Sequence, residues 1–158
     1  MSKILLINPN KWGRGITHIW IASHSGLLKR KGHKVKLFDS TFYQNWHKSL
    51  NKEEEYKPTD LDKLVKQNKN DILKDLQKLV NDFQPDIIFW SAISSHIHSE
   101  GEYVNIQNGY DLVKNIDFIK PILLVTGGLQ AISAPEIILD KMRKIDFLIR
   151  GESELTLL

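Results

Sequence analysis

The segment KILLINPN, residues 3–10, decides the fold class of this chain. Its apolar run is followed at once by the turn-forming residues Asn8, Pro9 and Asn10. A short apolar run between turn formers is typical of a strand that is buried on both faces, as strands of parallel sheets are. We therefore expect a buried strand over 3–7 at the start of an α/β domain.

Strand and helix patterns continue to alternate along the rest of the chain. The sequence predicts helices over 17–31, 72–83, 110–118 and 135–143, and further strands over 33–39, 87–90, 121–125 and 146–149. Strand–helix–strand repeats require crossover connections and hence parallel strands. We predict a three-layer Rossmann-like or flavodoxin-like sandwich with a mostly parallel sheet of about five strands.

Composition limits the classes of protein to which the chain can belong. The 158 residues, 41% of them hydrophobic, fit one domain with a substantial core. The net charge of +3 is too small to indicate a nucleic-acid partner. The apolar runs are far shorter than the ~20 residues of a membrane helix, and strand-like sequence begins at once. We expect a cytoplasmic protein with no membrane partner.

Cysteine is absent from the chain. Disulfides, thiolate zinc sites, cysteine-ligated iron–sulfur clusters and cysteine nucleophiles are therefore excluded within these residues. The segment 40–70 is polar, carries three consecutive glutamates at 53–55 and has weak periodicity. A connection of this length is uncommon inside a compact domain, so we expect either a partly helical insertion or a functional cover.

Ligands of open α/β sheets bind beyond the carboxyl ends of the strands. This rule directs attention to segments 8–15, 39–43, 91–98, 127–130 and 150–154. Gly127 and Gly128 would let a ligand approach the backbone, or would only form a tight turn. Serines after the third strand would contact a ligand, or would only satisfy backbone groups. His96 and His98 have metal-ligand spacing, but the sequence supplies no obvious third ligand nearby.

A nucleotide-binding site is one alternative. Gly13 and Gly15 precede a predicted helix, and Asp39 ends the second strand, where a ribose-binding acid would lie. The third glycine of the dinucleotide fingerprint is missing, because the corresponding position is His18. A P-loop motif is also absent.

Taken in order, the segments KILLINPN, GLLKRKGHKVKLFDSTFY, PDIIFWSAIS, PILLVTGGLQA and IDFLIRGESE resemble the N-terminal cobalamin-binding domain of cobalamin-dependent radical S-adenosylmethionine enzymes. The resemblance covers nearly all of residues 1–158, apart from 40–70 and 100–108. It implies a corrin ring across the carboxyl edge of the sheet. The cofactor-binding residues that it implies are Asn10, Arg14, Ser91, Ala92, Ser94, Gly127, Gly128 and Gln130.

Two departures from the family pattern qualify what the resemblance implies. The Asp-x-His-x-x-Gly motif that supplies a cobalt-ligating histidine is absent, since Ile16 and Ile21 flank His18 at the Asp and Gly positions. The resemblance therefore favours cobalamin bound without a protein histidine. It leaves the group at the lower face of the cobalt unassigned, and Arg14, His18 and water are the candidates. The three-cysteine motif of the radical domain is absent too.

The leading hypothesis is accordingly a cobalamin-binding module that is not catalytic alone. A C-terminal radical S-adenosylmethionine domain, in the parent protein or in a separate partner, would supply S-adenosylmethionine and a [4Fe–4S] cluster for methyl transfer or related chemistry. The alternatives are a structural or docking domain without a ligand, and a nucleotide-binding Rossmann enzyme.

Overall fold

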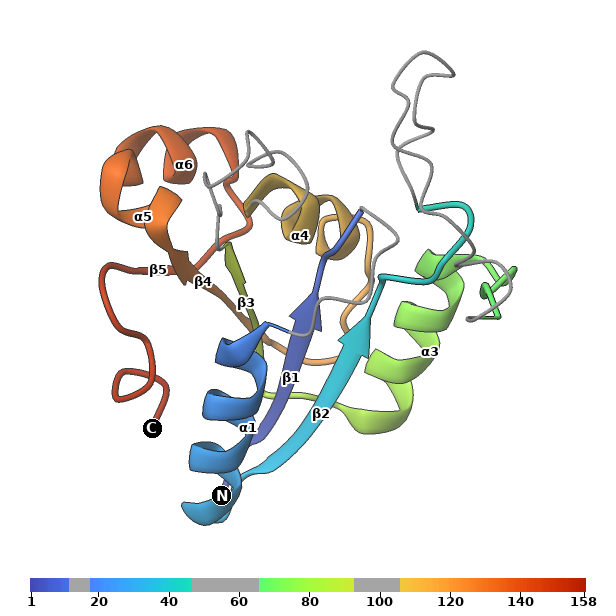
Figure 1. Cartoon of the computed structure of the whole chain (residues 1–158), viewed down its shortest axis with the longest axis horizontal. Helices are drawn as coiled ribbons and strands as arrows, with labels where there is room; N and C mark the ends of the chain where they lie inside the picture. The colour runs from blue at the N-terminus through green and yellow to red at the C-terminus, as the bar shows by residue number, and fades with distance from the viewer. Residues whose placement is uncertain (12–17, 47–65, 93–105) are drawn as a thin grey trace.

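The computed structural model describes residues 1–11, 18–46, 66–92 and 106–158 (Figure 1). Its elements in chain order are β1 (Lys3–Asn8), α1 (Ile19–Arg30), β2 (Lys34–Asp39), α3 (Ile72–Phe83), β3 (Ile87–Ala92), α4 (Ile106–Val113), β4 (Leu123–Gly128), α5 (Leu129–Ser133), α6 (Pro135–Lys141) and β5 (Phe147–Ile149). Among these residues, no helix has the length and hydropathy needed to cross a membrane.

The five strands form one sheet in the order β2-β1-β3-β4-β5. All four neighbouring pairs are parallel. This is the flavodoxin-like strand order, in which the direction of winding reverses between β1 and β3. The structure thus confirms the predicted three-layer α/β class, with a sheet that is parallel throughout.

Alternate residues of β1 point into two separate cores. Ile4 and Leu6 pack with Trp20 of α1, whereas Leu5 and Ile7 pack on the face that α3 and α4 cover (Figure 1). Residues 4–7 are completely buried, which explains why this strand reads as a continuous apolar run. Each such side chain contributes about 1.5–3 kcal/mol of transfer free energy.

The predicted helix over 72–83 is confirmed as α3. The side chain of Asp71 accepts hydrogen bonds from the backbone N–H groups of Leu73 and Lys74, and this N-cap sets the first residue of the helix. Helix α1 ends just before Gly32, whose φ of +87° suits a glycine at this position.

Tyr43 ties the segment after β2 to α3, because its hydroxyl donates to Asp75 Oδ2 at 2.9 Å. Burial, followed by the hydrogen bond and the charge of Asp75, raises the pKa of Tyr43 from 10.0 to about 12. The folded state thus retains the phenol proton more tightly than the unfolded state. The stabilisation is complete below pH 10 and should be lost as the pH rises through about 12.

We predict that Tyr43→Phe removes this alkaline-dependent loss of stability. The measurement is urea unfolding of both proteins over the alkaline range, alongside a phenolate titration by near-ultraviolet absorbance. If the wild type and Tyr43→Phe lost stability in parallel across this range, the contribution assigned to Tyr43 would be wrong.

Two strands run further towards their carboxyl ends than we predicted. Strand β3 continues to Ala92, and β4 covers Leu123–Gly128 instead of beginning at Pro121. The register explains both ends, because Ser91 pairs with Gly127 and Ala92 with Gly128. Gly127 and Gly128 therefore lie inside β4, whereas the prediction places them after the end of that strand. The short helix α5, which follows at once, was not predicted.

Helix α4 also begins earlier than the predicted span of 110–118, and it ends at Val113. Trp90 contacts its first turn, because the indole Nε1–H donates to the carbonyl oxygen of Ile106 at 3.1 Å. Gly109 lies so close to the same indole that any side chain would collide with it. Gly109, which precedes the predicted helix, is a packing position inside α4.

Candidate functional site at the carboxyl edge of the sheet

The pairing between β1 and β3 stops before the two strands end. Their described register covers only Ile4–Leu6 against Ile87–Phe89. Beyond it, β1 remains paired with β2 as far as Asn8 and Asp39, and β3 remains paired with β4 as far as Ala92 and Gly128. The two halves of the sheet are therefore unpaired from each other at their carboxyl ends. This is the topological switch point, where ligands of such sheets bind.

Ser91 and Gly127 meet on the β3–β4 side of the switch point. Ser91 is buried and pairs with Gly127 in the ladder. A Cβ added to Gly127 would lie 3.3 Å from the carbonyl oxygen of Ile149 and 3.8 Å from Cε2 of Phe89. A side chain at this position would therefore point to the face of the sheet that α1 covers. Gly128 has a φ of +104°, which side chains disfavour. The structure brings these predicted residues together, and their role in binding stays a prediction.

A polar cluster occupies the carboxyl ends of β1 and β2. Asn8 Nδ2 donates to Asp39 Oδ1 at 3.1 Å, and the same oxygen accepts from Thr41 N at 3.0 Å. Ser40 Oγ is 2.8 Å from the carbonyl oxygen of Asn8 and 3.1 Å from that of Asn10. Asn10, a predicted cofactor-binding residue, is itself buried, and Ser40 fixes its backbone.

His18 lies immediately before α1, in an extended conformation. Burial lowers the pKa of His18 below its ordinary value of 6.5, while the nearby charge of Asp39 opposes this with a smaller effect. Burial therefore favours the neutral imidazole.

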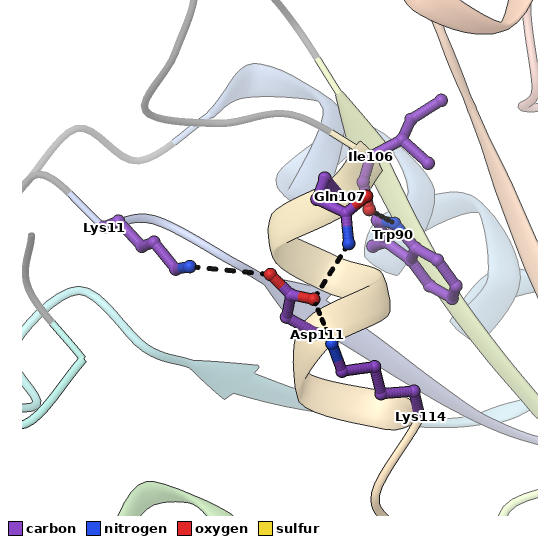
Figure 2. Close-up of polar contacts among 6 residues, drawn as sticks. All are labelled: Lys11, Trp90, Ile106, Gln107, Asp111 and Lys114. Atoms are coloured by element: carbon purple, nitrogen blue, oxygen red, sulfur yellow. Dashed lines mark hydrogen bonds and ion pairs between the residues drawn. The ribbon is translucent and has the colours of Figure 1, made fainter. Parts of the chain in front are cut away.

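Lys11 connects the end of β1 to helix α4, a contact that the sequence did not predict (Figure 2). Its ammonium lies 3.8 Å from Asp111 Oδ2 and 4.1 Å from the centre of the Trp46 ring. Burial raises the pKa of Asp111, but hydrogen bonds from Lys114 and Gln107 and the charge of the two lysines outweigh it and lower that pKa. No local pattern signals this contact, since Lys11 and Asp111 are far apart in the sequence.

Ser153, after β5, is attached to α1 by a buried hydrogen bond that we also did not predict. His24 Nδ1 is 2.7 Å from the carbonyl oxygen of Trp20, which can only accept, so Nδ1 carries the proton. In the neutral ring, Nε2 must then accept from Ser153 Oγ at 2.7 Å. His24 also stacks on Phe89 at 5.3 Å. This contact holds the segment 151–154 against α1 and the sheet.

We predict that Ser153→Ala lowers the free energy of unfolding by about 1–3 kcal/mol, because it leaves the buried His24 Nε2 without a donor. Urea unfolding measures the change. In a His24→Phe background the same substitution should have a much smaller effect, and equal losses in both backgrounds would show that the two groups are not coupled.

One cavity among the described residues extends from the amino edge of the sheet to Ile149 and Arg150 at the end of β5. It has a volume of about 530 Å³ and is lined mostly by apolar side chains on the α1 face of β3–β5, including Ile87, Leu123, Val125 and Phe147. Ser2 and His33 at the amino edge also line it. We place the site at the switch point because the buried polar groups and the glycines lie there.

Several predicted residues lie outside the part of the chain that the structure describes. Arg14 and Ser94 lie outside the described residues, as do Gly13, Gly15, His96, His98 and the positions 47–65 of the expected insertion. Ala92 ends β3 and Gln130 lies in α5, but their side chains are outside the description. Within the part that is described, no three His, Asp or Glu side chains gather as a metal site.

No family model matches this chain, and no curated protein matches it. Two solved structures of the radical S-adenosylmethionine methyltransferase TsrM from Kitasatospora setae do match. One, with tryptophan substrate and an S-adenosylmethionine analogue bound, gives a TM-score of 0.68 at 16% identity over 99% of this chain and 24% of that chain. The other, with cobalamin and a [4Fe–4S] cluster bound, gives 0.67 at 17% over 99% and 25%.

The chain therefore spans about a quarter of the length of the solved structures that it matches. At this identity the likeness shows the fold. The chain is an α/β, Rossmann-like domain with a fold that is also found in a cobalamin-containing radical S-adenosylmethionine methyltransferase.

Proposed function

We propose that this domain binds cobalamin across the carboxyl edge of its sheet and acts as the cofactor-holding module of a radical S-adenosylmethionine enzyme. The observation that carries the proposal is the separation of β1 from β3 at the switch point, in a fold that matches a cobalamin-containing methyltransferase over 99% of this chain. The family resemblance of the sequence supports the same function.

The residues at the switch point suit a large, amide-rich ligand. Glycine at 127 and 128 permits close approach of a ligand to the backbone of β4. The hydroxyl of Ser91 can donate and accept hydrogen bonds at the neighbouring strand end. Asn10, Arg14, Ala92, Ser94 and Gln130 complete the set of residues that we expect to contact the cofactor.

The protein's part in the chemistry is to bind and orient the cofactor. When bound, cobalamin supplies a cobalt centre for methyl transfer or related chemistry. Because the chain has no cysteine, the ligands of a [4Fe–4S] cluster would come from a radical S-adenosylmethionine domain elsewhere in the same protein or from a partner. We further propose that the cobalt is held without a protein histidine and that the protein works in the cytoplasm.

Equilibrium dialysis against hydroxocobalamin tests the proposal. We expect the whole chain to retain one corrinoid, detected by its visible spectrum, with micromolar affinity. NAD and ATP, used in parallel, should not bind. The proposal would be contradicted if the protein retained no corrin absorbance and if calorimetry at high protein concentration detected no heat of binding. Binding of NAD instead would favour the nucleotide-binding alternative.

A further inference from the structure

Four buried side-chain atoms have no hydrogen-bond partner among the described residues. Two of them are the indole nitrogens of Trp20 and Trp46. The other two, Asn8 Oδ1 and His18 Nε2, belong to residues that lie near Asp39 at the carboxyl edge of the sheet. A buried polar atom without a partner costs more free energy than an ordinary hydrogen bond contributes, so such atoms are uncommon in folded proteins. Two of them near one carboxylate, at a switch point, indicate a ligand.

The chemistry of Asn8 is fixed by its neighbour Asp39. The carboxylate of Asp39 can only accept, so the amide atom 3.1 Å from it must be Nδ2. The remaining atom, Oδ1, is therefore an acceptor that needs a donor. Asn8 is only 1% exposed, so water at the protein surface cannot donate a hydrogen bond to Oδ1.

His18 supplies the second group. It lies close enough to Asp39 for the charge of that carboxylate to affect its pKa, and burial favours the neutral imidazole. A neutral imidazole offers one N–H donor and one acceptor nitrogen. Unlike a lysine or arginine, it adds no positive charge that would hold an anion.

These properties select the kind of ligand group. It must donate to Asn8 Oδ1 while lying near the negative charge of Asp39, which disfavours phosphate and carboxylate groups. An uncharged group with N–H donors and a carbonyl acceptor satisfies both unpartnered atoms. Primary carboxamides have this chemistry, and they surround the edge of a corrin ring.

Building on the proposed function, we propose that Asn8 and His18 bind a primary carboxamide of the corrinoid. Asn8 Oδ1 accepts from the amide NH₂ group, and His18 Nε2 forms a hydrogen bond with the same amide. His18 is thus an amide-binding residue, not a ligand of the cobalt. Binding has to uncover both atoms, and their new hydrogen bonds offset part of that cost.

Substitutions at His18 test the protein side of this contact. His18→Gln keeps an N–H donor and a carbonyl oxygen near the Nε2 position, whereas His18→Phe keeps the ring shape without a polar atom. We expect the dissociation constant for hydroxocobalamin to rise about tenfold in His18→Phe and to change little in His18→Gln. The control is His33→Phe at the amino edge, which should bind like the wild type.

Modified ligands test the contact without altering the fold. Cobalamin derivatives in which a single carboxamide is hydrolysed to a carboxylate should bind like cobalamin, except for one isomer, which should bind at least tenfold more weakly. That penalty should shrink in Asn8→Leu and His18→Phe, provided that circular dichroism shows them to be folded. In a double-mutant cycle, a loss of affinity that shrinks when the protein side chain is replaced indicates direct contact between that side chain and the altered ligand group.

Three results would overturn the inference while leaving cobalamin binding intact. They are equal affinities of the wild type and His18→Phe, equal penalties for all carboxylate isomers, and nitrogen hyperfine coupling from His18 in the electron paramagnetic resonance spectrum of the cobalt(II) form. Failure of the wild type to bind any corrinoid would instead contradict the proposed function, and this inference with it.

Discussion

Replacing Gly109 with alanine is expected to destabilise the domain by about 3 kcal/mol or more, enough to unfold a marginally stable protein. The added Cβ would lie 2.2 Å from Cδ1 and 2.4 Å from Nε1 of Trp90. The indole is completely buried and is fixed by its hydrogen bond to Ile106, so it cannot easily move aside. Either α4 or Trp90 must shift, and both belong to the core beneath the switch point.

Urea unfolding followed by circular dichroism measures this effect. The matched control is Gly26→Ala in the middle of α1, because a Cβ at Gly26 would have no atom within 4 Å. That substitution should stabilise the protein by about 0.5–1 kcal/mol, since alanine favours helix. If Gly109→Ala unfolded at the same urea concentration as the wild type, this result would contradict the close packing of α4 against Trp90.

The substitution Gly127→Leu is expected to weaken cobalamin binding by about a hundredfold, the upper end of what overfilling a packed site costs. A leucine side chain would project from β4 onto the α1 face, beside the switch point. Gly127→Ala is the control, because its Cβ meets the carbonyl oxygen of Ile149 at 3.3 Å and needs only a small shift.

Dialysis against hydroxocobalamin and thermal unfolding should be measured on both Gly127 variants. If the Gly127→Leu protein is folded and binds cobalamin like the wild type, β4 is not part of the binding site. If a full-length parent enzyme carrying Gly127→Leu were as active as its wild type, a docking role for the domain would be favoured.

The elements that were predicted closely are those with a strong local pattern. Residues 4–7 form a continuous apolar run because both faces of β1 are covered. The buried positions of α3, such as Leu76 and Val80, recur at helical spacing, and Asp71 marks its start. The carboxyl-edge rule likewise pointed to Ser91 and Gly127, which the sheet register brings together.

The features that were missed depend on contacts between distant parts of the chain. Trp90 packs against Gly109 and donates a hydrogen bond to Ile106 in α4, and both residues are far from Trp90 in the sequence. The bond between His24 and Ser153 joins residues 129 positions apart. Neither partner has a local pattern that identifies the other.

The central claim is that the ligand binds where β1 and β3 separate. The most direct test is a titration of isotope-labelled protein with diamagnetic hydroxocobalamin, followed by backbone amide chemical shifts. We predict that the largest shift changes cluster at Asn8, Ser91, Gly127 and Gly128, with the amino-edge residue Asp86 unaffected. Shift changes confined to the amino edge, or no changes at saturating cobalamin, would contradict the claim.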